Sequence, residues 1–108
     1  MSTLLLIPPR LLGAVSRNDW REMIRERAVL FTGTGSEEHR ARTRNELGDI
    51  FESIHFFDDL GTADRAELLA IELHGNSPFT RVVATGEDDL YRAARMRELF
   101  GISGTPRR

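Results

Sequence analysis

The sequence predicts a parallel α/β fold, because segments typical of strands and segments typical of helices alternate along the chain. Residues 3–7 and 28–32 are continuously apolar, which is typical of strands buried on both faces of a parallel sheet. The helical segments are apolar on one side, as expected of helices that cover such a sheet, although the apolar face of the helix expected from Ser36 is thin. A chain of 108 residues is long enough for one domain of this kind and too short for two independent cores.

The first expected strand is "TLLLI", residues 3–7, and the prolines at positions 8 and 9 end it. The segment "SRNDWREMIRER" that follows predicts a short amphipathic helix, which Ser16 or Asn18 could cap. Three residues at helical spacing form its expected apolar face: Trp20, Met23 and Ile24.

The second expected strand is "AVLFT", residues 28–32, which the turn residues "GTGS" terminate. A helix is expected from Ser36, because this residue can serve as N-cap and is followed by acidic residues first and arginines later. The third expected strand is "SIHFF", residues 53–57, and it leads into the acidic loop "DDLGT".

The third helix is expected in "TADRAELLAIELHG", with Gly75 as its stop. Its apolar face comprises Ala66, Leu69, Ala70 and Leu73. "RVVAT", residues 81–85, is the fourth expected strand. The last helix follows, with acidic residues in its first turn and Gly101 at its end. These four successive strand–helix units predict a four-stranded parallel, Rossmann-like sheet with helices on both faces, spanning residues 1–104. Residues 105–108 then begin an exit linker.

The composition excludes several classes of function. Acidic and basic residues are interleaved and the net charge is −2, which disfavours nucleic acid as a partner. The chain has no cysteine, so it has neither disulfides nor thiolate chemistry, and its lack of lysine excludes a P-loop or Schiff-base lysine. The apolar N-terminal run is too short to cross a membrane and lacks the basic start of a signal peptide, so we expect a cytoplasmic protein.

Ligands of open parallel sheets bind outside the carboxyl ends of the strands. In this chain that geometry selects Pro8–Leu12, Thr32–Ser36, Asp58–Thr62 and Thr85–Asp88. The candidate substrate-binding residues within these segments are Arg10, Thr34, Gly35, Asp58, Thr85 and Glu87.

Four of these six candidates have a simpler explanation. The pair of glycines in "TGTGS" could expose amides to an anion, but a turn capped by Ser36 is the favoured interpretation. Asp58 and Asp59 could bind magnesium or a substrate amine, although solvated loop carboxylates are favoured. Glu87 is also explained by the helix dipole. His39, His55 and His74 lack the spacing of metal ligands, so the sequence predicts no metal site, and no residue is assigned a catalytic role.

The segment "RVVATGEDDLYRAARMRELFGISG", residues 81–104, resembles the last strand and helix of the N-terminal domain of ATP-grasp ligases. In that family the strand ends in a small residue, a glutamate opens the helix, alanines pack it, and a glycine-containing exit follows. The matching positions are Thr85, Glu87, Ala93, Ala94, Arg97, Glu98, Leu99, Gly101, Ile102 and Gly104.

The resemblance implies a substrate-side domain that is not catalytic alone and contains no cofactor. ATP and Mg²⁺ would be held by downstream ATP-grasp domains, in cis or in trans, which activate a small-molecule carboxylate as an acyl phosphate for attack by an amine or a thiol. Glu87 is the residue that transfers most directly, as a crevice-lining glutamate. Two alternatives stay open: a free-standing module that binds a small anion or nucleotide at "TGTGS", and a docking domain without a ligand that forms a homo-oligomer.

Overall fold

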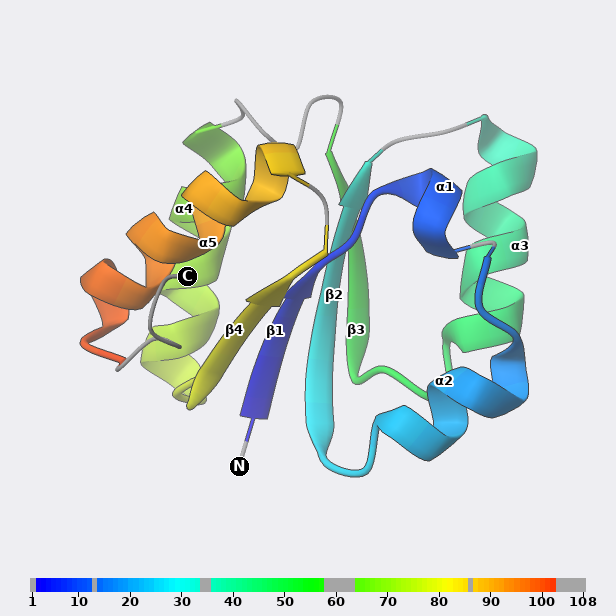
Figure 1. The fold of residues 1–108 in the computed structure, drawn as a ribbon, viewed down its shortest axis with the longest axis horizontal. Helices are drawn as coiled ribbons and strands as arrows, with labels where there is room; N and C mark the ends of the chain where they lie inside the picture. The colour runs from blue at the N-terminus through cyan, green and yellow to red at the C-terminus, as the bar shows by residue number, and fades with distance from the viewer. Residues whose placement is uncertain (1, 13, 34–35, 58–63, 86, 103–108) are drawn as a thin grey trace.

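A four-stranded parallel sheet of order β3-β2-β1-β4 organises the chain, with helices on both of its faces (Figure 1). The computed structural model describes residues 2–12, 14–33, 36–57, 64–85 and 87–102. Its strands are β1 (Ser2–Leu6), β2 (Arg27–Gly33), β3 (Ser53–Phe57) and β4 (Arg81–Ala84). Its helices are α1 (Pro9–Leu12), α2 (Arg17–Met23), α3 (Glu37–Leu47), α4 (Asp64–Asn76) and α5 (Glu87–Phe100). The predicted α/β class is therefore confirmed.

The two central strands explain the continuous apolar runs of the sequence. β1 pairs with β2 through Leu4↔Val29 and with β4 through Leu4↔Val82, so both of its edges are bonded. All five residues of β1 are buried, as expected for a strand covered on both faces. The outer strands β3 and β4 contain half-exposed positions, which accords with their places at the edges of the sheet.

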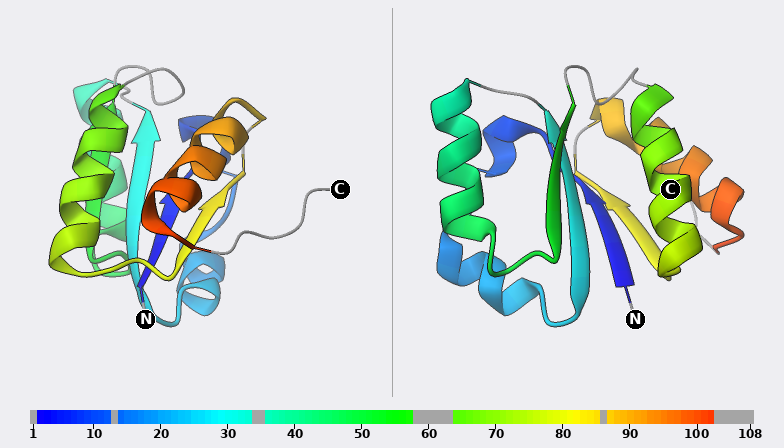
Figure 2. Two further views of the ribbon diagram at one scale, coloured as in Figure 1. Left: turned by 90° about the vertical axis from the view of Figure 1, so that its left-hand side faces the viewer. Right: turned by 180° about the vertical axis from the view of Figure 1, so that it is seen from behind.

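Two hydrophobic cores lie on opposite faces of this sheet because side chains alternate along each strand. Leu4 and Leu6 point toward α4 and α5, whereas Leu5 and Ile7 point toward α1, α2 and α3. Figure 2 shows the two helical layers from other directions. The first core includes Val29, Phe31, Phe57, Ala66, Ala70, Phe79, Val82, Ala93 and Met96. The second includes Leu12, Trp20, Ala28, Leu30, Leu47, Phe51 and Ile54.

The first crossover differs from the sequence prediction in two respects. Pro9 does not merely end a strand but opens the short helix α1, a position where its missing N–H is harmless. Ser16 caps α2 as expected, accepting a hydrogen bond from the Asp19 amide at 3.2 Å. Trp20 is buried as predicted. Met23 was predicted to lie on the apolar face, but its side chain is exposed, so this part of the prediction is wrong. The helix ends at Met23, and the extended backbone of Ile24 lets that residue, rather than Met23, pack against the core.

The two helices on the other face end differently. Gly75 was expected to stop α4, but the helix continues to Asn76, and the Ser77 amide still donates to the Leu73 carbonyl at 2.9 Å. Pro78 follows directly and cannot extend the helix. The predicted helical face is confirmed, since Ala66 and Ala70 are buried and the leucines at positions 69 and 73 pack against them.

Gly101 ends α5 as predicted, with a positive φ of 69° that L-amino acids rarely adopt. Its amide donates to the Glu98 carbonyl at 3.2 Å, and the Ile102 amide donates to the Arg97 carbonyl at 2.9 Å. This pair of bonds is a Schellman motif, and Ile102 packs back against the core below α5. Within the described part of the chain, no helix has both the length and the hydropathy needed to cross a membrane.

Candidate functional site

The order of the strands creates one topological switch point. From β1 the chain proceeds to β2 and β3 through α1, α2 and α3 on one face of the sheet. It then returns through α4 to β4, on the other side of β1, and continues into α5 on the opposite face. The segments that leave β1 and β4 therefore diverge to opposite faces. In open parallel sheets, ligands bind in the crevice where the connections diverge in this way.

Hydrogen bonds hold the backbone in place at this switch point. The Ile7 amide donates to the Phe31 carbonyl at 3.0 Å, and the Thr85 amide donates to the Leu6 carbonyl at 3.3 Å. Both bonds lie just beyond the ends of the strands, so the first residues of each departing segment keep a defined position. The side chain of Thr85 is exposed and offers a hydroxyl group that can donate or accept a hydrogen bond.

Three of the predicted binding residues belong to this switch point. Thr85 directly follows β4, Glu87 is the first residue of α5, and Arg10 lies in the first turn of α1, just after β1. For Arg10 and Glu87 the structure describes the backbone alone. Thr34, Gly35 and Asp58 lie outside the described residues.

The flanks of the glycine loop after β2 have structural explanations. A side chain at Gly33 would place its Cβ 3.1 Å from Cγ of Pro9, so a larger residue there requires Pro9, at the start of α1, to shift slightly. Ser36 accepts a hydrogen bond from the His39 amide at 3.1 Å and caps α3. The predicted cap at Ser36 is thus confirmed, and Gly33 belongs to β2 rather than to a turn. The expected turn at Thr34 and Gly35 and their binding of an anion lie outside the described residues.

Thr32 is a residue at the carboxyl end of β2 whose importance the sequence did not reveal. It is fully buried, and its Oγ1 has no hydrogen-bond partner among the described residues. A buried hydroxyl without a partner loses its hydration and gains nothing in exchange. Its position within an otherwise apolar strand is the signal that could have drawn attention to it.

Substituting valine for Thr32 is therefore expected to raise the free energy of unfolding by about 1 kcal/mol, since the change keeps the shape and removes the unpaired hydroxyl. Chemical denaturation measures this quantity. The matched control is Thr43→Val in α3, where the buried hydroxyl donates to the His39 carbonyl at 2.9 Å. That variant should be destabilised by up to about 1 kcal/mol. Loss of stability in Thr32→Val would show that the hydroxyl has a partner in the folded protein.

A charged cluster connects the first half of α4 with α5. Glu67 forms an ion pair with Arg92, and both side chains are largely buried, with 13% and 8% of their surface exposed. Arg95 also donates to both carboxylate oxygens of Glu67, at 3.1 and 3.2 Å. The hydrogen bonds from Arg95, together with the charges of both arginines, hold the pKa of Glu67 below its usual value although burial opposes this. The cluster fixes the spacing of the two helices, and we assign it a structural role.

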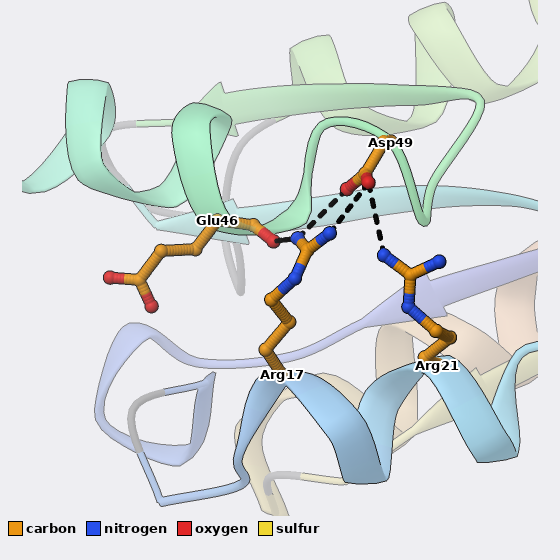
Figure 3. Close-up of polar contacts among 4 residues, drawn as sticks. All are labelled: Arg17, Arg21, Glu46 and Asp49. Atoms are coloured by element: carbon orange, nitrogen blue, oxygen red, sulfur yellow. Dashed lines mark hydrogen bonds and ion pairs between the residues drawn. The ribbon is translucent and has the colours of Figure 1, made fainter.

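A second charged cluster joins α2 to the turn between α3 and β3 (Figure 3). Arg17 donates two hydrogen bonds to the carboxylate of Asp49, at 2.6 and 2.9 Å, and a third to the carbonyl of Glu46. Arg21 donates to the same carboxylate at 3.0 Å. The cluster clamps α2 to the turn that follows α3. The hydrogen bonds from Arg17 hold the pKa of Asp49 well below its usual range.

Stability should consequently fall on acidification as Asp49 becomes protonated. A carboxyl group whose pKa is lower in the folded protein stabilises the fold above its unfolded pKa of about 4 and loses this contribution as the pH falls further. We expect Asp49→Asn to have a lower melting temperature than wild type at pH 7 and a smaller loss of melting temperature between about pH 5 and 3. Glu46→Gln is the matched control, because Glu46 bonds Arg17 through its backbone. Parallel pH profiles of wild type and Asp49→Asn would disprove this role of Asp49.

The fold defines the chain as a Rossmann-like α/β domain, and the switch point at the carboxyl ends of β1 and β4 is its candidate binding site. No protein-family model and no curated protein matches the sequence. Among the residues that the structure describes, no three metal-binding side chains gather in one place.

Proposed function

We propose that the chain is the N-terminal, substrate-side domain of an ATP-dependent ligase of the ATP-grasp type. In this proposal the crevice between β1 and β4 contributes to the pocket of a small carboxylate, with Arg10, Thr85 and Glu87 as its first contacts. ATP and Mg²⁺ are held by further ATP-grasp domains in cis or in trans. The carboxylate is activated there as an acyl phosphate, from which an amine or a thiol displaces phosphate.

The observation that carries the proposal is the switch point itself. It brings the segments that begin with Pro8 and Thr85 together at the carboxyl ends of β1 and β4, where α/β proteins bind small ligands. In this proposal the domain binds and orients the substrate, and Thr85, which follows β4, supplies an exposed hydroxyl that can form a hydrogen bond to it. A domain that binds but does not catalyse fits the role of a substrate-side domain.

The residues shared with ATP-grasp N-terminal domains also have defined roles in the fold. Ala93 is buried against the sheet, and Nε of Arg97 donates to the Val82 carbonyl at 3.1 Å, which fastens α5 to β4. Gly101 and Ile102 form the Schellman motif that ends the helix. These features support the proposal because the matching positions determine how α5 sits behind the crevice and where the chain leaves it.

A thermal-shift titration with Mg-ATP provides the first test. A ligand raises the melting temperature only if it binds the native state, so this chain alone should show no shift with millimolar Mg-ATP. Marked stabilisation would contradict the assignment of the nucleotide to other domains.

The coding sequence downstream of Arg108, or in a neighbouring gene, provides the second test. We expect it to encode a lysine-containing ATP-binding region. If neither location encodes such a region, the ligase proposal is wrong, and the free-standing binding module becomes the better explanation.

A further inference from the structure

Among the described residues, four large apolar side chains are exposed on α4 and α5, and three of them, Leu68, Ile71 and Leu99, lie on or beside the outer surface of α4. The exposed fractions are 66% for Leu68, 46% for Ile71 and 50% for Leu99. Isolated exposed leucines are common on protein surfaces, but a contiguous apolar patch marks a site of association. The significance of these residues therefore depends on whether they adjoin one another.

The contacts between the helices indicate that two of them do. Two residues of α4 contact α5. Glu67 forms an ion pair with Arg92, and the ring of His74 stacks on the ring of Phe100 with 4.2 Å between the two centroids. Ile71 lies four residues after Glu67 and three before His74, so helical spacing places it on the same side of α4.

Leu99 has the corresponding position on α5. It follows Arg95, which bonds Glu67, by four residues, and it precedes Phe100, which stacks on His74. Ile71 and Leu99 therefore border the seam between the two helices, and Leu68 continues the apolar surface across the outside of α4.

The charged residues on either side of Leu68 form a pattern that can pair with the same pattern on a second copy of the chain. Arg65 precedes Leu68 by three residues and Glu72 follows it by four, and both charged residues are exposed. A twofold rotation about an axis near Leu68 reverses the direction of the helix and exchanges the two ends of this pattern. It brings Arg65 of one copy opposite the partner's Glu72, and the partner's Arg65 opposite Glu72, while the two Leu68 side chains meet at the centre.

We propose that the chain forms a twofold-symmetric homodimer through antiparallel contact of the α4 helices, with Ile71 and Leu99 extending the apolar interface. We infer a second copy of the chain as the partner, because Arg65 and Glu72 lie at nearly equal distances on either side of Leu68. A twofold rotation about this centre therefore places each charge opposite one of the other sign. The proposal concerns the face remote from the sheet and does not depend on the ligase proposal.

Sedimentation velocity tests the dimer over a range of protein concentrations from micromolar to millimolar. The mass of wild type should rise from 12.3 kDa toward twice that value. Leu68→Arg should remain monomeric at the same concentrations. Leu90→Arg is the matched control: Leu90 is similarly exposed on α5 but lies outside the proposed interface, so this variant should dimerise like wild type.

Charge reversal tests the orientation of the two copies. Arg65→Glu alone should weaken dimerisation by about tenfold or more, because both symmetric ion pairs become repulsive. The double variant Arg65→Glu with Glu72→Arg should restore it. Circular dichroism verifies that each variant is folded. A wild-type mass that stays at 12.3 kDa, equal effects of Leu68→Arg and Leu90→Arg, or failure of the double variant to restore dimerisation would each overturn the proposal.

Discussion

Replacing Glu67 with glutamine is expected to lower the free energy of unfolding by roughly 2–4 kcal/mol. The substitution removes the carboxylate that pairs with Arg92 and Arg95 but leaves the Arg92 side chain in its largely buried position. Water cannot replace the lost ion pair at a guanidinium that is only 8% exposed without local unfolding. Urea denaturation of both proteins measures the difference.

The matched control for this prediction is Glu52→Gln. Glu52 forms an ion pair with Arg27, but both side chains remain substantially exposed, so solvent already screens their attraction. We expect a change of no more than about 0.5 kcal/mol. If the two variants lose equal stability, burial does not govern the contribution of the Glu67 cluster.

Met96→Ala is expected to lower the free energy of unfolding by roughly 2–5 kcal/mol. Met96 is fully buried on the inner side of α5, in a core that includes the small residues Ala66, Ala70 and Ala93. These alanines bring the helices close to the sheet, and Met96 fills the volume between them. Truncation leaves a cavity that the small neighbours cannot occupy, and thermal or chemical denaturation detects the loss.

The same helix supplies the control. Leu90→Ala removes a similar apolar volume from a side chain that is 52% exposed, and it should change the free energy of unfolding by no more than about 1 kcal/mol. A larger loss for Leu90→Ala than for Met96→Ala would mean that α5 is rotated relative to the arrangement described here.

The class of fold was predictable because the two central strands are unambiguous. The runs "TLLLI" and "AVLF" have no polar face, so only a position inside a covered sheet satisfies them. The boundaries of the capped helices were predictable for a similar local reason, as Ser16, Ser36 and Gly101 show. Caps act through neighbouring backbone groups, so their signals are contained in a few adjacent residues.

Features that depend on tertiary contacts were not predictable in the same way. The sequence favours Met23 and Ile24 equally, and only the end of α2 decides which of them meets the core. From the sequence, Arg92 is expected to be exposed to solvent. In the structure it is largely buried and forms an ion pair with Glu67 on α4. Among the described residues the hydroxyl of Thr32 has no partner, and this too is a property of the folded surroundings rather than of the strand.

The candidate site shows the same division. The sequence indicates that ligands belong at the carboxyl ends of the strands, but it does not indicate which strands are neighbours. The order β3-β2-β1-β4 puts the topological switch point between β1 and β4, and Arg10, Thr85 and Glu87 are the candidates that follow these two strands. The polar positions His55 and Arg81 in β3 and β4 were the available hint that these strands lie at the edges.

The most direct test of the candidate crevice is an NMR titration of the ¹⁵N-labelled chain with a panel of small amino and hydroxy carboxylic acids. We expect chemical-shift changes at the amides of Ile7, Arg10, Thr85 and Glu87, and weaker changes in Thr85→Val, which lacks the hydroxyl. Two results would contradict the assignment of the substrate site to the carboxyl ends of β1 and β4. One is a set of changes centred on the amino ends of the strands, at residues such as Ala28 and Ser53, and the other is no change at these carboxyl ends with any acid of the panel.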